Sequence, residues 1–189
     1  RVIASMDAFV GRRVVVTEKQ DGENSSLYRA YTHARSVDGR NHPSRSWLKQ
    51  FWSQICSDIP PGWRVCGENL YARHSIAYEN LETYFMGFSV WNERNVCLSW
   101  DETQEWFDLL GVTPVPVLYD GIYDEKLIRS LWTEKDWATS EGYVVRLAAE
   151  IEYGQFRHCV GKFVRPGHVQ TAKHWMHGQR IVPNKLRVE

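Results

Sequence analysis

The chain has 189 residues, of which 43% are hydrophobic and 24% charged, and its 23 basic side chains are balanced by 23 acidic ones. This length and composition are typical of a single soluble globular domain. The longest apolar runs, such as Val14-Val15-Val16, are far shorter than the roughly 20 residues needed to span a bilayer, and no signal peptide is recognisable. We therefore expect a cytoplasmic protein from a bacterial, phage or other intracellular context.

Strands are predicted to dominate the first third of the sequence. A run rich in β-branched residues from Arg13 to Lys19 stops at Asp21-Gly22, and a second run extends from Leu27 to Thr32. This pattern predicts two strands paired as a hairpin. Apolar residues with helical spacing over 46–57 predict a helix. Two further strands are predicted, over 63–71 and 83–91.

The second half of the sequence alternates between helices and strands. Ser99 and Glu102 form a capping-box pattern that predicts the start of a helix, and Gly111 is expected to end it. The remaining predicted elements are a strand over 115–119, a helix over 124–131, and strands over 142–147 and 159–164 that are candidates to pair with each other. The predicted fold class is α+β with a mostly antiparallel sheet and flanking helices.

Charge is unevenly distributed along the chain. Residues 99–156 contain four Lys and Arg against twelve Asp and Glu, whereas residues 157–189 contain seven Lys and Arg, one acid and four of the seven His. The basic C-terminal stretch is a candidate surface for phosphate groups. A solvated basic end without a partner agrees equally well with the charge alone.

The four cysteines, at positions 56, 66, 97 and 159, lie far apart and lack the paired spacing of metal ligands. We expect free thiols in a reducing compartment. Cys159 could join His174 and His177 on a zinc ion, but the sequence suggests no fourth ligand for a tetrahedral site.

The segment Glu18-Lys19-Gln20-Asp21-Gly22-Glu23-Asn24 is the first candidate for chemistry. A lysine just before a tight Asp-Gly turn is held by its strand and can point into a cleft. Its amine becomes a nucleophile once the proton is lost, which nearby positive charge or a metal ion favours. Taken alone, the segment is more typical of an exposed lysine beside an ordinary hairpin turn.

Further motifs follow this lysine in a fixed order. The series resembles the covalent nucleotidyltransferases, which include polynucleotide ligases and RNA capping enzymes, and it is most similar to the RNA ligase branch. The resemblance covers residues 18–165. Its later motifs are His33-Ala34-Arg35-Ser36, Gly67-Glu68-Asn69, Gly87-Phe88-Ser89-Val90, Glu141-Gly142-Tyr143-Val144-Val145-Arg146 and Gly161-Lys162-Phe163-Val164-Arg165.

The resemblance implies roles for the basic residues. Lys19 would attack the α-phosphate of ATP and form lysyl-AMP with release of pyrophosphate. Lys162 would contact the α-phosphate, with Arg165 as a helper. Arg35 falls where the family meets phosphates and the incoming 5′-phosphate end. These residue types suit a reaction that depends on positioning and charge neutralisation.

The resemblance also implies how the nucleotide is bound. Glu18 falls where the family's backbone meets the adenine edge, and Asn24 falls at the phosphates. Glu68 would bind the ribose hydroxyls and Phe88 would stack on adenine. Glu141 would hold the catalytic Mg²⁺ or Mn²⁺, directly or through water.

The sequence departs from the family pattern in two places. Ser89 stands where many RNA ligases have an acid, and Lys162 has Val164 in place of a second lysine, for which Arg165 is a possible substitute. DNA ligases and capping enzymes continue into an OB domain, and only 24 residues follow Arg165. We therefore expect one adenylyltransferase domain over 1–189, with a basic appendage at about 166–189 and no OB domain.

The leading hypothesis is a monomeric, non-membrane ATP-dependent RNA ligase for RNA repair, which joins a 5′-phosphate to a 3′-hydroxyl. An accessory RNA-binding domain or protein is a possible partner. The alternative enzymes are a GTP-dependent capping-type guanylyltransferase and a DNA-nick ligase. The non-enzyme alternative is an RNA-binding module derived from a ligase.

Overall fold

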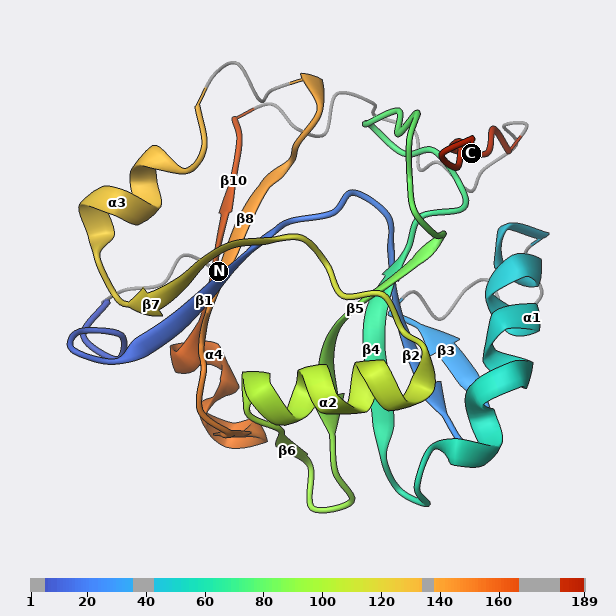
Figure 1. Ribbon diagram of the computed structural model, residues 1–189, viewed down its shortest axis with the longest axis horizontal. Coiled ribbons are helices and arrows are strands. Elements are labelled where there is room, and N and C mark those ends of the chain that lie inside the picture. Colours follow the sequence, from blue (N-terminus) through green and yellow to red (C-terminus); the bar gives the residue numbers. More distant parts are fainter. Residues whose placement is uncertain (1–5, 36–42, 134–137, 167–180, 189) are drawn as a thin grey trace.

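The computed structural model describes residues 6–35, 43–133, 138–166 and 181–188. Over these ranges the chain forms two antiparallel sheets flanked by helices (Figure 1), which confirms the predicted α+β class. None of the helices in these ranges has the length and apolar character needed to cross a membrane.

The smaller sheet has four strands in the order β10-β8-β1-β7. The central strand β1 is a run of valines that are fully buried, as expected of a strand covered on both faces. The bounds are β1 (Arg13–Glu18), β7 (Val117–Ile122), β8 (Gly142–Leu147) and β10 (Val160–Val164). The pairing of β8 with β10 confirms that the two late strands are neighbours.

The larger sheet has six strands in the order β3-β2-β4-β5-β6-β9. It contains the two strands predicted near 63–71 and 83–91, here β4 and β5, which pair with each other. The bounds are β2 (Glu23–Tyr28), β3 (Thr32–Ala34), β4 (Arg64–Asn69), β5 (Phe85–Trp91), β6 (Val96–Cys97) and β9 (Ile151–Glu152).

The predicted hairpin between the first two strands is wrong. Strand β1 pairs with β7 and β8, whereas β2 pairs with β3 and β4 in the other sheet. The segment Lys19–Gly22 therefore carries the chain from one sheet to the other. An Asp-Gly turn signal describes only the local backbone, and the strands that pair with β1 come from residues about a hundred positions later. The predicted strand over 115–119 is also displaced, because β7 begins at Val117.

Two helices cover the outer face of the larger sheet, α1 (Ser46–Ile55) and α2 (Trp100–Leu110). Their apolar faces pack on Leu27, Val65 and Phe85 to form one buried cluster. The capping box at the start of α2 is present, since Ser99 accepts from the backbone N–H of Glu102 and the Glu102 carboxylate accepts from that of Ser99. The remaining helical segments are α3 (Glu125–Ser130), α4 (Phe156–Cys159), η1 (Pro43–Arg45), η2 (Cys56–Asp58) and η4 (Tyr153–Gln155).

The last described segment, 181–188, folds back along the loop between β4 and β5. The Asn184 side-chain amide donates to the carbonyl oxygen of Leu70 at 2.7 Å and its carbonyl accepts from the backbone of Tyr78 at 3.0 Å. Leu81 exchanges two backbone hydrogen bonds with this segment, and Lys185 pairs with Glu79 at 2.6 Å. Part of the basic appendage is thus integral to the fold. Its residues 167–180, including His174 and His177 of the hypothetical zinc site, lie outside the described residues.

Candidate active site

Lys19 lies directly after β1, at the point where the chain leaves the smaller sheet. Its backbone N–H donates to the carbonyl oxygen of Gly142 at 2.9 Å, which aligns it with the start of β8. Its ammonium group makes an ion pair with Glu141 at 2.7 Å. The side chain of Lys19 is 20% exposed and that of Glu141 is 9% exposed. The two residues that the motifs indicate as nucleophile and metal ligand are therefore in direct contact, 122 positions apart in sequence.

Gly142 allows strand β10 to lie close to the start of β8. Its φ of 148° is unfavourable for residues with a side chain, and a Cβ at this position would overlap the carbonyl oxygen of Phe163 on β10. The glycine lets β10 approach closely enough for the backbone N–H of Arg165 to donate to the carbonyl oxygen of Glu141 at 3.0 Å.

The strand register places Lys162 on the same face as Lys19. Thr17, Val144 and Lys162 are paired across β1, β8 and β10. Since side chains alternate along a strand, Lys19, two positions after Thr17, shares this face. Lys162 is exposed, and Arg165 is partly buried with its Nε unpaired among the described residues. Lys162 therefore lies on the face of the sheet that carries Lys19, whereas Arg165 is linked to Glu141 through its backbone.

The turn after Lys19 is held from the loop between β4 and β5. The Asp21 carboxylate accepts from the backbone N–H of Ile76 at 2.7 Å, and the Asp21 N–H donates to the hydroxyl of Tyr78 at 2.9 Å. Gly22 is required here, because a Cβ would lie 2.5 Å from the carbonyl oxygen of Asn69. These contacts explain why the Asp-Gly pair fixes the exit of Lys19 from the sheet without forming a hairpin.

Glu68 on β4 faces Lys19 from the larger sheet. Its carboxylate accepts from the backbone N–H of Gly22 at 3.2 Å. Burial raises the pKa of Glu68 to about 7, an effect that the charge of Glu141 reinforces and that of Lys19 opposes. A carboxyl group in this position can accept hydrogen bonds from a ligand in the cleft.

Asn24 on β2 and Arg35 just after β3 lie together in the larger sheet. Both side chains are exposed, and the backbone N–H of Arg35 donates to the carbonyl oxygen of Asn24 at 3.0 Å. The neighbouring Glu23 is buried and bonded through both carboxylate oxygens to Arg45, also buried. This bidentate pair anchors the start of β2 and so fixes the strand that carries Asn24.

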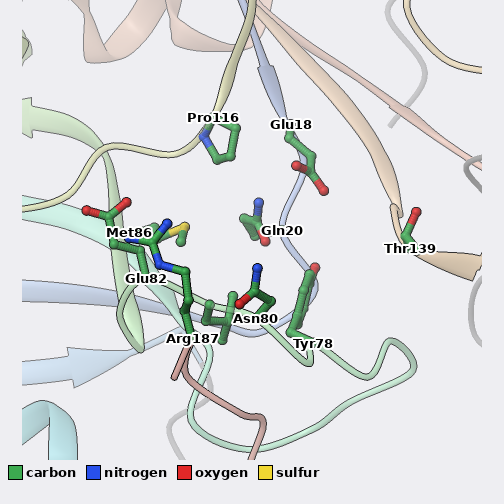
Figure 2. Close-up of a pocket in the computed structure, with 10 residues that line it drawn as sticks. Glu18, Gln20, Tyr78, Asn80, Glu82, Met86, Pro116, Thr139 and Arg187 are labelled. Carbon is green, nitrogen blue, oxygen red and sulfur yellow. The ribbon is translucent and has the colours of Figure 1, made fainter. Parts of the chain in front are cut away.

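A cavity of about 420 Å³ is lined in part by Glu18 and Gln20, the two residues that flank Lys19 in the sequence (Figure 2). This volume lies within the range of small-ligand sites. Its lining consists of Glu18, Gln20, Tyr78, Asn80, Leu81, Glu82, Met86, Pro116, Thr139 and Arg187. Phe88 is partly buried two residues after Met86, packed against the apolar clusters of both sheets. Of the predicted nucleotide-binding residues, Glu18 lines the cavity and Phe88 does not.

Of the ten residues that line this cavity, sequence reasoning found only Glu18, and three of those it missed are Gln20, Tyr78 and Arg187. Gln20 is 5% exposed, and its Oε1 accepts no hydrogen bond among the described residues. Tyr78 holds Asp21, and burial raises the pKa of its hydroxyl. Arg187 arrives with the C-terminal segment. The position of Gln20 between Lys19 and Asp21 is a usable signal, whereas nothing in the sequence around Arg187 indicates that it returns to the motif lysine.

The carboxylate of Glu141 fits a divalent cation. Among the described residues, no group of three or more His, Cys, Asp or Glu side chains is arranged to hold a metal ion. Mg²⁺ in phosphoryl-transfer sites is bound through one or two carboxylates, with substrate phosphates and water as the remaining ligands. A single buried carboxylate beside the nucleophile therefore meets the requirement for such a metal.

The sequence matches the RNA ligase family model over residues 12–164. The chain therefore belongs to the RNA ligase family. A comparison with curated protein sequences found no match.

Solved structures of RNA ligases share this fold. Naegleria gruberi RNA ligase, in a mutant form with ATP and Mn, superposes with a TM-score of 0.59 and 16% identity over 90% of this chain and 55% of its own. An archaeal ATP-dependent RNA ligase superposes with a TM-score of 0.57 and 19% identity over 86% of this chain and 45% of its own. The chain spans about half the length of these proteins.

Proposed function

We propose that the chain is the nucleotidyltransferase core of an ATP-dependent RNA ligase, with Lys19 as the nucleophile. The observation that carries this proposal is the contact of Lys19 with Glu141 at the point where the chain passes from one sheet to the other. Both residues stand in the motifs that define the resemblance, and they come from opposite ends of the sequence. The match to the family, together with the ATP and Mn that accompany the Naegleria RNA ligase, supports the choice of ATP and a divalent metal.

The first step transfers AMP to the protein. The deprotonated Nζ of Lys19 attacks the α-phosphorus, a nitrogen–phosphorus bond forms, and the bond to the β-phosphate oxygen breaks to release pyrophosphate. The Lys19–Glu141 ion pair holds the amine in place, and this contact must loosen before the amine can attack. In this proposal Lys162 offsets negative charge on the α-phosphate, with Arg165 as a helper.

The metal ion supplies positive charge for the phosphate oxygens when it is bound. Glu141 is the residue that would hold it. A carboxylate that held the metal would no longer hold the lysine, so one side chain would both anchor the nucleophile at rest and release it for reaction.

The nucleotide base binds close to Lys19 in this proposal. The backbone at Glu18 would meet the adenine edge, and Phe88 would cover one face of adenine at roughly 1–3 kcal/mol. Glu68 accepts from the ribose hydroxyls, and Asn24 contacts the phosphates.

The later steps use RNA. The 5′-phosphate of an RNA end takes AMP from Lys19, and the 3′-hydroxyl of a second end then displaces AMP as the ends are sealed. Arg35, exposed beside Asn24, contacts the incoming 5′-phosphate. Free thiols at all four cysteines agree with RNA repair in a reducing cytoplasm. We propose that the protein acts as a monomer, with an accessory RNA-binding domain or protein as a possible partner.

The test is covalent labelling. The protein is incubated with α-labelled ATP or GTP and Mg²⁺ or Mn²⁺ and separated on a denaturing gel. ATP should label the wild type and leave Lys19→Ala unlabelled. Labelling by GTP alone would indicate a capping-type guanylyltransferase, and equal labelling of Lys19→Ala would exclude Lys19. If the adduct forms and no RNA is sealed, the acceptor is a different molecule.

A further inference from the structure

The hairpin formed by β2 and β3 carries a group of three aromatic rings, Tyr28, Tyr31 and His33, which we call the hairpin rings. The Tyr28 and Tyr31 rings are stacked with centroids 4.5 Å apart, and the His33 ring lies 5.6 Å from Tyr28 and 6.4 Å from Tyr31. All three planes lie within 27° of parallel. Tyr31 is 53% exposed and His33 is also exposed, so the rings are not part of the core.

Backbone hydrogen bonds and a neighbouring arginine hold the hairpin that carries the hairpin rings. The turn is closed by a backbone hydrogen bond from Tyr28 to Tyr31 at 2.9 Å, and the indole of Trp52 donates to the carbonyl oxygen of Tyr28 at 2.6 Å. In the next strand, Arg64 pairs in register with Tyr28. Arg64 is itself fixed, because its guanidinium lies 4.4 Å from the Trp91 ring centroid and bonds to Asn95 at 2.6 Å. Rings ordered in advance lose little entropy when a ligand stacks on them.

The hairpin rings lie on the face of the sheet that leads to the active site. Asn24, Ser26 and Tyr28 alternate along β2 and therefore share one face. In register, Asn24 pairs with Glu68 and Ser26 pairs with His33, which puts His33 on this face as well. Tyr28 is four positions after Asn24 on β2, which corresponds to about 13 Å at about 3.3 Å per residue. Exposed aromatic rings thus lie about 13 Å along the strand from Asn24, which pairs with Glu68 of the candidate active site.

The charge around the hairpin rings is positive. Arg29 in the turn and Arg35 after β3 are both exposed, and Arg64 is the neighbour of Tyr28 on the adjacent strand β4. Aromatic rings combined with basic side chains are the usual surface for single-stranded nucleic acid, since every base has a π-face and every nucleotide carries a phosphate.

We propose that the hairpin rings bind unpaired bases of the RNA strand whose end reaches Lys19. This proposal rests on the RNA ligase function proposed above and adds the place where the strand is held. Stacking on Tyr31 and His33 orients the strand, and Arg29 and Arg35 contact its phosphates. The surface reads no sequence, because stacking tolerates all four bases.

The test compares two exposed tyrosines at opposite edges of the same sheet. Tyr31 is at the β3 edge, and Tyr153, which is 64% exposed, follows β9 at the other edge. Binding of a 5′-phosphorylated single-stranded oligoribonucleotide is measured by fluorescence anisotropy for the wild type, Tyr31→Ala, Tyr31→Phe and Tyr153→Ala. Lysyl-AMP formation is measured in parallel with ATP alone.

Tyr31→Ala should weaken binding at least about fivefold, the lower limit for loss of one base–aromatic stack. Tyr31→Phe keeps the ring and should bind like the wild type, as should Tyr153→Ala. All variants should form the adduct normally. A blunt RNA duplex exposes base faces only at its two terminal pairs, so its binding should depend much less on Tyr31 than binding of the single strand does.

Unchanged binding in Tyr31→Ala would overturn the proposal, as would equal loss with the duplex or with Tyr153→Ala. Loss of adduct and RNA binding together in Tyr31→Ala would assign the rings to the nucleotide site or the fold, and would also overturn it. If the wild type forms no adduct, the proposed ligase function is wrong. The anisotropy comparison still tests separately whether the hairpin rings bind RNA.

Discussion

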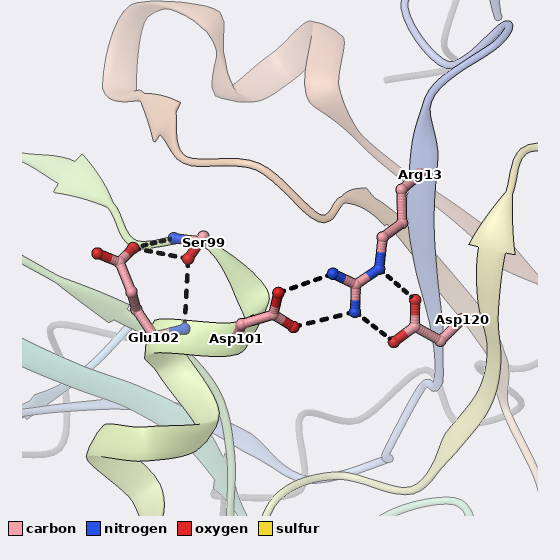
Figure 3. Close-up of polar contacts among 5 residues, drawn as sticks. All are labelled: Arg13, Ser99, Asp101, Glu102 and Asp120. Atoms are coloured by element: carbon pink, nitrogen blue, oxygen red, sulfur yellow. Dashed lines mark hydrogen bonds and ion pairs between the residues drawn. The ribbon is translucent and has the colours of Figure 1, made fainter.

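The two ends of strand β1 hold their basic side chains in opposite ways. At the first end, Arg13 is bonded through its guanidinium to Asp101 of α2 and Asp120 of β7, with all four contacts between 2.7 and 2.9 Å (Figure 3). At the other end, the single amine of Lys19 meets Glu141 at 2.7 Å. The Arg13 side chain is 43% exposed, whereas that of Lys19 is 20% exposed.

The ion pairs of Arg13 have a structural role, whereas the ion pair of Lys19 holds the proposed nucleophile. Hydrogen bonds that its guanidinium donates to Asp120 and Asp101 raise the pKa of Arg13, which stays charged and links α2 to the smaller sheet. Lysine can lose its proton and arginine does not. The same strand thus has a redundant, exposed ionic link at one end and a sheltered lysine–carboxylate pair at the end where the motifs converge.

The largest effect should come from removing the amine at the sheltered end. Lys19→Arg keeps the positive charge and can keep the contact with Glu141, but guanidinium is not a nucleophile at neutral pH. We expect adduct formation to fall at least about a thousandfold with little change in melting temperature. Intact mass after incubation with ATP gives the result. Retention of a labelled product would place the nucleophile elsewhere.

The next largest effect is expected at the partner carboxylate. Glu141→Gln keeps the shape, removes the charge and removes a ligand for the metal. The rate of adduct formation should fall on the order of a hundredfold, measured by quenched labelling at several Mg²⁺ concentrations. Full activity at low Mg²⁺ would exclude a metal role for this residue. Glu102→Gln, in the capping box of α2, is the matched control and should leave labelling unchanged.

Glu68 sharpens the comparison through pH. Its pKa is raised to about 7 by burial, so between its ordinary value near 4.5 and about 7 the folded protein binds more protons than the unfolded chain. The free energy of unfolding should therefore fall in this window as pH rises, by on the order of 1–3 kcal/mol, and level off above it. Glu68→Gln should lack this decline in urea titrations. An identical pH profile in the variant would refute the assignment.

The smallest effect should come from the exposed end. Arg13→Ala removes both carboxylate contacts, but exposed ion pairs are worth little, so we expect a loss of about 1 kcal/mol in the free energy of unfolding. The Arg13 side chain holds the pKa of Asp101 below its usual range, so this contribution is present at neutral pH and is lost as the solution becomes acidic. Adduct yield should be unchanged. Loss of the adduct would show that the two ends of β1 are coupled.

Local patterns were sufficient for much of the fold. The valines of β1, the capping box at Ser99 and the Gly142–Leu147 strand are predicted from the sequence and are present with nearly the same bounds. Each depends on neighbouring residues alone: side-chain alternation, reciprocal caps, and apolar spacing. The predicted hairpin is wrong because an Asp-Gly pair reports a change of direction and not the strand that β1 will meet.

The sequence by itself also determined which residue types we propose for nucleotide transfer, because the motifs carry a lysine, carboxylates and basic groups in a fixed order. Only the tertiary structure decided that Lys19 and Glu141 touch, that the β4–β5 loop holds Asp21, and that Arg187 lines the cavity. These contacts join segments separated by 55 to more than 100 residues. Strand register and close approach of backbones at glycine set such contacts, and neither quantity is visible in a local stretch of sequence.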